Sequence, residues 1–354
     1  GNHYLTEKTA LAQLAVAFPE FRGGGEWLRH ARREIRETVL GETYPEGEYK
    51  ELSTHYQRIV TENLQRFLDL LRFAGYRGAE EALFRRGEAM WDYLFWVMRP
   101  DGNGPLNNGS DLENLRAPRL LEAAGSYGRE DWRYIWSNGR EGIRPPAPPS
   151  RYFKWSGHAV MRSGWDRGAH WSFFDLGPHG SGHQHRDRLH FSVAVFGQDC
   201  LVDAGRYHYR PDKWKEYFTG PRSHNVILAD GRGTRPPPLT VSRPLRNRWT
   251  RSRNYVFAGG EARFPDDKGV HRRSLFFFPD RYWIVLDEVI SFGGVGLEAL
   301  WHVHPEWAVE RQPRRLRITS QAGGLTLIHV AETPWDVAAL RGVEEPKPRG
   351  WYAP

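Results

Sequence analysis

Five residues in the middle of the chain have side chains suited to metal binding or acid–base chemistry. His183 and His185 are separated by one residue, Asp187 follows them, and Asp203 and His224 come later, each beside a strand-like run. Turns between strands can therefore bring His185, Asp203 and His224 together. Two imidazole nitrogens and a carboxylate oxygen suit Zn²⁺ better than Ca²⁺, which prefers oxygen ligands alone. The sequence predicts a zinc-like site, with His183 free for another task.

Two questions about this site stay open at the level of the residues. Asp187 and His190 are reserve ligands for the predicted metal. The alternative is a hydrogen-bonded polar cluster that holds loops together without a metal, because the chain contains 15 histidines and some lie close together by chance. A bound metal, in turn, has two possible roles, holding loops or activating water.

A second group of polar residues lies in the first part of the chain. Asn2 and His3 open it, and the motif Glu51–Tyr56 follows after about fifty residues. A phenol such as that of Tyr56 acts as a general acid or base when its surroundings adjust its pKa. Asn and His side chains donate hydrogen bonds to a carboxylate or to a developing oxyanion. The alternative for Tyr56 is simple packing, since it begins a helix-like run.

Length and composition indicate a globular protein of two domains. The chain has 354 residues, which is too long for one ordinary core. Because 39% of its residues are hydrophobic and 14% aromatic, it is too apolar to be disordered. Its net charge is +7. This excess favours an anionic partner such as an acidic polysaccharide, nucleic acid or a membrane surface, or else an ordinary solvated surface.

Two kinds of structure are excluded by the composition. Cys200 is the single cysteine, so intrachain disulfides and cysteine-based metal clusters are excluded. There is no run of about 18 apolar residues, so no membrane span is expected.

The start of the chain shows no basic-then-apolar signal, but a helix-like pattern begins at once. We therefore expect that upstream sequence is missing from this chain.

The elements that must position these residues fall into two regions. Residues 3 to about 138 carry apolar residues at helical spacing, and a shorter helix is expected over 111–124. Three stripes are formed by Leu11, Leu14, Ala15 and Phe18; by Ile59, Leu64, Phe67, Leu68 and Leu71; and by Ala82, Leu83, Met90, Leu94 and Val97. The proline-rich segment 144–149 is a stiff linker. We place the domains at 1–143 and 152–354, with a linker over 144–151.

The second region has the pattern of strands. Short β-rich runs lie at 190–196, 226–228, 275–278, 283–286 and 325–328, and Asp280 and Arg281 fit a tight hairpin turn between two of them. Because no helical segment is recognised between these runs, we expect an antiparallel sheet and a β-sandwich domain.

Several motifs together resemble one family. They are Gly182-His183-Gln184-His185-Arg186-Asp187-Arg188-Leu189-His190-Phe191, Leu201-Val202-Asp203-Ala204-Gly205-Arg206-Tyr207, Ser223-His224-Asn225 with Asp230-Gly231, the hairpin Phe277–Asp287, the motif Glu51–Tyr56 and the opening Asn2-His3. The chain is identified from them as a member of the heparinase II/III-like family of polysaccharide lyases. The resemblance covers most of the chain and is most specific in the histidine segment.

The resemblance implies a fold and an activity. The fold is an α+β multidomain one, in which part of a helical (α/α) toroid precedes an antiparallel β-sandwich. The activity is β-elimination on a polysaccharide that contains uronic acid, of the glycosaminoglycan or alginate type. A base removes the C5 proton, an acid protonates the departing O4, and a 4,5-unsaturated uronate results. The family also implies export to the periplasm or secretion.

Carried over by position, the resemblance assigns roles to individual residues. Zinc, as a structural metal, would be held by His185, Asp203 and His224. Tyr56 would be the catalytic phenol, with His183 facing the cleft as a second catalytic residue. Asn2 and His3 would hold the substrate carboxylate.

Further residues are candidates for substrate binding. Arg206, Tyr207 and Tyr209 follow the predicted ligand Asp203 and are placed along the same cleft, although surface packing explains them equally well. Asn107, Asn108 and Asp111 lie on a loop that can reach sugar hydroxyls, and His55 precedes the catalytic phenol. Gln57 stands where many relatives have His, which puts local subsite contacts in doubt but not the phenol.

Three alternative functions remain. A metal-dependent glycan hydrolase would use the metal to activate water and yield no unsaturated product. A non-catalytic protein would bind acidic glycans without turnover. A nucleic-acid-binding protein would fit the charge, but no recognised nucleic-acid-binding signature supports it, so no nucleic-acid partner is expected.

Overall fold

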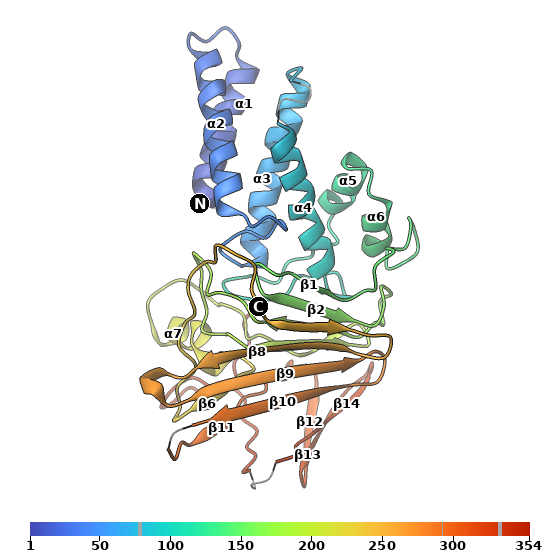
Figure 1. The fold of residues 1–354 in the computed structure, drawn as a ribbon, viewed down its shortest axis with the longest axis vertical. Helices are drawn as coiled ribbons and strands as arrows, with labels where there is room; N and C mark the ends of the chain where they lie inside the picture. Colours follow the sequence, from blue (N-terminus) through green and yellow to red (C-terminus); the bar gives the residue numbers. More distant parts are fainter. Residues whose placement is uncertain (77–79, 292, 332–334) are drawn as a thin grey trace.

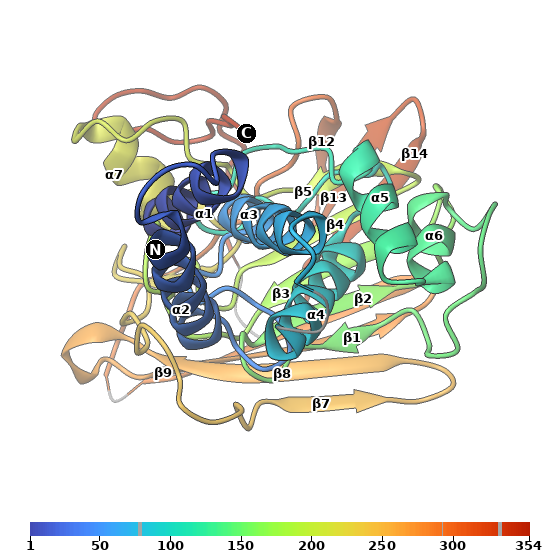
Figure 2. The same cartoon turned by 90° about the horizontal axis from the view of Figure 1, so that it is seen from above.

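The chain builds a layer of helices on top of layers of antiparallel sheet (Figures 1 and 2). A computed structural model describes residues 1–76, 80–291, 293–331 and 335–354. The helical part contains α1 (Asn2–Ala17), α2 (Gly24–Glu42), α3 (Thr54–Phe73), α4 (Glu81–Val97), α5 (Pro118–Ser126) and α6 (Glu130–Trp136). The predicted combination of helices and antiparallel sheets is therefore correct.

The predicted apolar stripes are correct for two helices and partly wrong for the first. In α3 and α4 the core is made by the expected residues, such as Leu64, Phe67 and Met90, which are fully buried. Of the predicted first stripe, Ala15 is buried and Leu11 packs partly against the core, but Leu14 and Phe18, the residue after α1, are 38% and 45% exposed. The rest of the side that packs on α2 and α3 is made by Asn2, Leu5, Thr9 and Ala12. Small and polar residues on this side hid the stripe from a search for apolar spacing.

A five-stranded antiparallel sheet forms the middle layer. Its strands follow chain order and are β1 (Arg151–Tyr152), β2 (His158–Arg162), β3 (Trp171–Asp175), β4 (Phe191–Val195) and β5 (Gln198–Leu201). One face packs on α4, α5 and α6 through Val160 and Phe173, and the other packs on the next sheet through Ala159 and Phe174. Because both faces are covered, every residue of β2 and β3 is buried.

A four-stranded antiparallel sheet covers the outer side. Its strands are β7 (Arg248–Arg251), β8 (Val256–Arg263), β9 (Val270–Phe278) and β10 (Tyr282–Ile290), in the order β10-β9-β8-β7. The predicted tight turn joins β9 to β10, with Asp280 at φ 58°. Val256, Ala258, Leu275 and Phe277 point inward to the core shared with the first sheet. The outward side chains are partly exposed to solvent.

Two smaller sheets and two short helical turns complete the strand region. β6 (Ile227–Ala229) pairs with β11 (Leu297–Ala299), and β12 (Ala308–Gln312), β13 (Arg315–Ser320) and β14 (Gly323–Ile328) form a three-stranded sheet. The 3₁₀ turns are η1 (Pro221–Ser223) and η2 (Pro265–Asp267).

Two secondary-structure predictions are wrong. The strand region was expected to lack helices, but α7 (Lys213–Thr219) lies within it. Its first turn is capped by Asp212, whose side chain accepts hydrogen bonds from the amides of Trp214 and Lys215. The helix expected over 111–124 begins only at Pro118, because residues 111–117 form a loop that packs against the start of α3. The proline-rich segment lies between α6 and β1.

Direct contacts join the helical layer to the first sheet. The Tyr93 hydroxyl lies 2.7 Å from Nδ1 of His158, and Arg162 donates a hydrogen bond to the Met98 carbonyl. The loop before α3 contributes Glu48, which accepts a hydrogen bond from the Ser156 hydroxyl at 2.9 Å. These contacts hold the start of α3 over the sheet loops. Among the helices described, none is long and apolar enough to cross a membrane.

Candidate functional site

Three segments distant in the sequence meet where the first turn of α3 faces the loops of the strand region. The ring of Tyr56 lies nearly parallel to that of His183, with centroids 3.7 Å apart and an angle of 14° between the planes. The hydroxyl of Tyr56 lies 2.8 Å from that of Tyr209. The helical layer therefore supplies one phenol, and two sheet loops supply an imidazole and a second phenol.

The backbone at this point is held in an uncommon conformation. His183 has φ 58°, in the left-handed region that non-glycine residues seldom adopt. Its carbonyl accepts a hydrogen bond from the Gly109 amide at 2.9 Å. A Cβ atom on Gly109 would lie 2.9 Å from the His183 Cβ, so only glycine permits this approach. The 107–111 loop thus clamps His183 against Tyr56.

Glu51 orients the imidazole of His183. Its Oε2 atom lies 2.8 Å from Nδ1 of His183, and its Oε1 atom accepts a hydrogen bond from the Tyr49 hydroxyl at 3.0 Å. An ionised carboxylate only accepts hydrogen bonds, so Nδ1 of His183 carries the proton and Nε2 is left as an acceptor. Glu51 belongs to the Glu51–Tyr56 motif, but no role was predicted for it from the sequence. Its place at the head of the Glu51–Tyr56 motif was the available signal.

The surroundings of Tyr56 keep its phenol protonated. Burial and the hydrogen bond with Tyr209 raise the pKa of Tyr56 well above its ordinary value, while the Arg206 charge opposes them. Arg206 lies over the ring of Tyr209, 4.5 Å from its centroid, and donates a hydrogen bond to Asp111 at 2.6 Å. Arg206 therefore joins the 107–111 loop to the phenol pair.

The structure places the other substrate-binding candidates in different settings. His55 packs edge-on to Tyr56, and its Nδ1 lies 2.7 Å from Glu113. Burial would raise the pKa of Glu113, but the hydrogen bonds from Arg58 and His55 lower it to about 2. Tyr207 is 56% exposed and packs near Trp214, Phe218 and His208.

Asn108, predicted to bind substrate, lies inside the protein between two loops. It is buried, its Oδ1 accepts a hydrogen bond from the His185 amide at 2.8 Å, and its Nδ2 donates one to the Leu52 carbonyl at 3.0 Å. Both polar groups of its side chain are thus used inside the protein. Asn108 links the loop of the metal candidate His185 to the start of α3.

Asn2 and His3 lie on the first turn of α1, at the end of the helical layer that faces the sheets (Figure 1). Asn2 is buried and His3 is exposed. Among the described residues, neither side chain forms a hydrogen bond with Tyr56 or His183. The structure therefore brings together Tyr56, His183, His55 and Arg206, and shows no hydrogen bond in its described part that joins Asn2 or His3 to them.

The three predicted metal ligands lie together beneath this site. His185, Asp203 and His224 are all buried, and one ligand atom of each lies within 4.8 Å of the other two. Nδ1 of His224 is 2.9 Å from Asp203. Nδ1 of His185 and Nε2 of His224 are buried without a hydrogen-bond partner in the described part of the chain. Unsatisfied buried nitrogens are costly, and a cation would satisfy them.

Charge and protonation also fit a cation here. Burial lowers the pKa of His185 to about 3, so its lone pairs are not taken by a second proton at neutral pH. Burial would raise the pKa of Asp203, but His224 and His190 lower it to about 2. Metal ligands must be deprotonated to bind, and both residues meet this requirement. Burial would lower the pKa of His224, but the charge and the hydrogen bond of Asp203 raise it, so a cation would have to displace a proton from this ring.

The reserve ligands have other surroundings. Nδ1 of His190 accepts a hydrogen bond from the Asn225 amide at 3.0 Å. Its proton therefore sits on Nε2, which faces Asp203 at 3.7 Å. At this distance Nε2 of His190 forms no hydrogen bond with the carboxylate, and His190 is not one of the grouped ligands. Asp187 is buried, and this burial raises its pKa to about 6.

Comparison with known proteins gives matches along most of the chain. Residues 145–352 match the family model described as heparinase II/III-like, C-terminal, and residues 1–127 match the one described as heparinase II/III N-terminus. The heparin-sulfate lyase of Pedobacter heparinus is 23% identical over 312 residues, which cover 86% of this chain and 46% of that protein. That of Bacteroides stercoris is 22% identical over 302 residues, covering 82% and 44%.

Solved structures show the same fold. The chain is similar to heparan sulfate lyase HepC from Pedobacter heparinus, with a TM-score of 0.82, 21% identity, and coverage of 94% of this chain and 53% of that one. It is also similar to a heparinase III, with a TM-score of 0.78, 22% identity, and coverage of 90% and 50%. The chain thus spans about half the length of these relatives.

Proposed function

This chain belongs to the heparinase II/III-like family, and from that premise we propose that it is a polysaccharide lyase acting on a glycosaminoglycan of the heparan sulfate class. The observation that carries the proposal is the stacked pair of Tyr56 and His183, one from each part of the chain. Relatives described as heparin-sulfate lyases support the substrate class.

The proposed reaction is β-elimination across C4 and C5 of a uronate. The C5 proton is weakly acidic, so its removal requires stabilisation of the carboxylate as the enolate-like intermediate forms. Nε2 of His183 takes the C5 proton, because Glu51 holds the proton of the ring on Nδ1. Tyr56 donates its proton to the departing O4, in keeping with a raised pKa that keeps the phenol protonated.

We assign the substrate carboxylate to the first turn of α1. Asn2 and His3 supply hydrogen-bond donors there, and the free amides at a helix N-terminus favour a negative charge. Arg206 is placed beside the phenols and fits a second anionic group of the sugar, such as a neighbouring sulfate. The positive charge of Arg206 would be shared between this group and Asp111, to which Arg206 donates a hydrogen bond.

We further propose that His185, Asp203 and His224 hold a structural zinc ion. The ion would supply a fixed positive charge that anchors the loops of the three ligands. Asn108 accepts a hydrogen bond from the His185 amide and donates one to Leu52. The proposed ligand loop is thereby tied to the start of α3, where Tyr56 lies. The role of these residues is to position His183 and the phenols.

The finer architecture and the location of the protein are part of the proposal. We propose that α1–α4 belong to an (α/α) toroid, that the facing sheets are the β-sandwich of the family, and that 144–151 links them. Family membership also supports a periplasmic or secreted protein.

A screen of polysaccharides tests the function. Heparan sulfate, heparin, hyaluronan, chondroitin sulfate and alginate are incubated with the protein, and the ultraviolet absorbance of unsaturated uronates is followed. The proposal expects absorbance to rise with heparan sulfate and to stay flat for Tyr56→Phe and His183→Ala. Cleavage without new absorbance would indicate a hydrolase, and a rise with alginate alone would overturn the substrate class.

A further inference from the structure

A run of exposed arginines along one sheet edge has no part in the proposed reaction. Residues 243–253 contain five arginines and no acidic residue, and all five arginines are exposed. We call residues 243–253 the arginine strip. It includes β7, the edge strand of the four-stranded sheet. The five residues are Arg243, Arg246, Arg248, Arg251 and Arg253.

The charges of the arginine strip are not neutralised within the protein. In the part of the chain that the structure describes, none of its guanidinium groups lies within 4.0 Å of a carboxylate, whereas arginines such as Arg58, Arg129 and Arg206 are paired with acidic residues. Clustered positive charge of this kind attracts polyanions and raises their rate of association. The strip is therefore complementary to an acidic polymer.

The segment before the strip borders the catalytic loop. The Gly180 amide donates a hydrogen bond to the Leu239 carbonyl at 2.9 Å, and the Val241 amide donates one to the Tyr44 hydroxyl at 3.1 Å. Gly180 is close in sequence to His183. The chain thus passes from a segment that is hydrogen bonded to the loop before His183 to the arginine strip, and the strip continues along the sheet edge (Figure 2).

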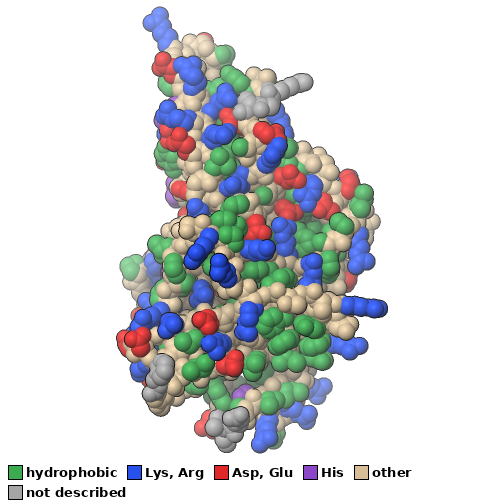
Figure 3. Space-filling view, viewed as in Figure 1, with side chains coloured by type: hydrophobic (Ala, Val, Ile, Leu, Met, Phe, Trp, Pro, Cys, Tyr) green, Lys and Arg blue, Asp and Glu red, His purple; other side chains and the backbone are tan. Residues whose placement is uncertain are grey.

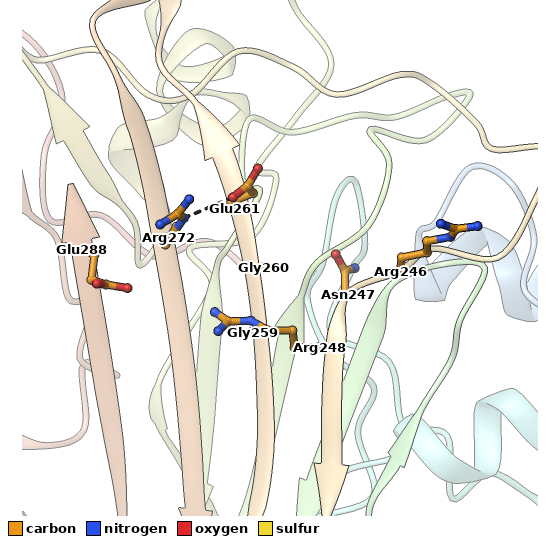
Figure 4. A pocket seen from close by; sticks show the side chains of 8 residues that line it. All are labelled: Arg246, Asn247, Arg248, Gly259, Gly260, Glu261, Arg272 and Glu288. Atoms are coloured by element: carbon orange, nitrogen blue, oxygen red, sulfur yellow. Dashed lines mark hydrogen bonds and ion pairs between the residues drawn. The ribbon is translucent and has the colours of Figure 1, made fainter. Parts of the chain in front are cut away.

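A groove of about 450 Å³ lies beside the strip on the outer face of the sheet (Figure 4). Arg248 is held across it, with its guanidinium 5.4 Å from the Phe257 ring centroid and a hydrogen bond of 3.1 Å to the Ser274 hydroxyl. The space above Gly259 admits this side chain, since a Cβ there would lie 3.1 Å from Nη2 of Arg248. One guanidinium is therefore fixed in place before any ligand arrives.

Acidic residues lie on the opposite side of the groove. Glu261 accepts a hydrogen bond from Arg272 at 3.2 Å, and Glu288 is the cross-strand partner of Arg272 on β10. The groove is thus basic along β7, whereas β8, β9 and β10 line it with two carboxylates and one guanidinium. In Figure 3, Lys and Arg side chains lie where the helical layer meets the sheets, and hydrophobic ones gather over the outer sheet. A polyanion is favoured along the β7 side.

We propose that the arginine strip is a non-catalytic track for a sulfated polysaccharide, which binds the part of the polymer that extends beyond the catalytic cleft. This proposal rests on the proposed function. Guanidinium groups pair with sulfate and carboxylate through two parallel hydrogen bonds. Attachment at the strip raises the effective concentration of the same chain at the cleft. A nucleic acid fits the charge as well, but the strip follows directly on the segment hydrogen bonded to the loop before His183, which favours the polymer cleaved there.

The test replaces three arginines of the strip whose side chains form no hydrogen bond in the described part of the chain. The variant is Arg243→Ala/Arg246→Ala/Arg253→Ala. The matched control, Arg72→Ala/Arg85→Ala/Arg119→Ala, loses the same charge from exposed helix positions. KM and kcat are measured on long heparan sulfate and on a tetrasaccharide. For the strip variant, KM on the polymer should be roughly tenfold higher. Its kcat on the polymer, and its KM and kcat on the tetrasaccharide, should be unchanged. Equal KM values for strip variant and control would overturn the proposal.

Binding without turnover separates this proposal from the function on which it rests. Each triple variant is combined with Tyr56→Phe, and its elution from immobilised heparan sulfate is followed as NaCl rises. The strip variant should elute at lower salt than the control, because fewer counterions are exchanged on binding. If retention depended on the strip but the parent protein did not cleave the polysaccharide, the proposed function would be overturned and the track would stand. Strip-dependent binding of duplex DNA, with polysaccharide retention unchanged, would overturn the track.

Discussion

The carboxylate of Glu51 lies 2.8 Å from Nδ1 of His183 and joins the loop before α3 to the catalytic loop of the strand region. The same carboxylate accepts a hydrogen bond from the Tyr49 hydroxyl at 3.0 Å. The ring of Tyr56 stacks on the imidazole ring of His183. The tautomer and the orientation of the imidazole therefore depend on a residue that does not contact the substrate in our proposal.

Replacement of Glu51 by Gln should lower kcat more than it changes KM. The amide keeps the shape of the side chain but removes the charge that favours a proton on Nδ1 and stabilises the imidazolium formed in the reaction. Loss of such supporting residues typically costs about 10–100-fold. The pH dependence of kcat should change as well, because a carboxylate no longer faces the imidazole that accepts the proton. An unchanged pH profile would count against this role.

Tyr49→Phe is the matched control for Glu51. It removes one hydrogen bond to the carboxylate but leaves the charge, so its effect on kcat should be several-fold at most. If Tyr49→Phe and Glu51→Gln reduced kcat equally, the loss would reflect local packing and not the charge on Glu51. Circular dichroism of both variants checks that the fold is kept.

Tyr56→Phe should lower kcat by roughly 10²–10⁴-fold, the usual contribution of a general acid or base. The variant keeps the ring that stacks on His183, so stability should change little. Tyr209→Phe is informative beside it, since it removes only the hydrogen bond to the Tyr56 hydroxyl at 2.8 Å. Steady-state rates on heparan sulfate measure both. Wild-type turnover by folded Tyr56→Phe would refute its assignment as the acid.

Removal of the proposed metal should reduce stability before it reduces catalysis. Without a cation, the buried nitrogens of His185 and His224 lack partners, and each costs about 1–3 kcal/mol. Chelation should therefore lower Tm by several degrees, as should His224→Ala, while kcat of the folded fraction stays close to normal. Calorimetry with metal analysis measures this. Loss of kcat in proportion to metal, at constant Tm, would favour metal-activated chemistry instead.

The sequence predicted those parts of the site whose residues have distinctive side chains. Three histidines, an aspartate and a tyrosine carry the motif, and the structure places His185, Asp203 and His224 within one buried cluster. The strands were predicted from β-rich runs, and the tight turn at Asp280 was predicted from its residues. These patterns are local, so a single sequence is enough to show them.

What the sequence missed depends on contacts between distant segments. Glu51 acquires its role only because the loop before α3 meets His183, and the hydrogen bonds of Asn108 to His185 and Leu52 likewise join segments far apart in the sequence. The face of α1 was missed because Ala12 and Thr9 are buried there in place of larger apolar residues. Close packing of helices selects small side chains, which apolar spacing does not reveal.

The interface between the helical layer and the first sheet should weaken as pH rises from about 5 to 7, because Glu48 is buried there. Burial raises its pKa from 4.5 to about 7. The folded state thus binds this proton more tightly than the unfolded state, so the contribution is fully present below pH 4.5 and is lost as pH passes through 7. The shift corresponds to roughly 3 kcal/mol. Glu48→Gln, which stays neutral, should remove the loss and be more stable than the parent at pH 8.

Urea unfolding at pH 5 and pH 8 measures the effect of Glu48. The amide oxygen introduced by Glu48→Gln can still accept the hydrogen bond of the Ser156 hydroxyl, which lies 2.9 Å from Oε1 of Glu48 in the structure. At pH 5 the two proteins should therefore have similar free energies of unfolding. Their difference at pH 8 then isolates the cost of ionising a carboxylate whose Oε2 is buried without a partner among the described residues. Parallel pH dependence in the two proteins would show that other groups control the stability of this interface.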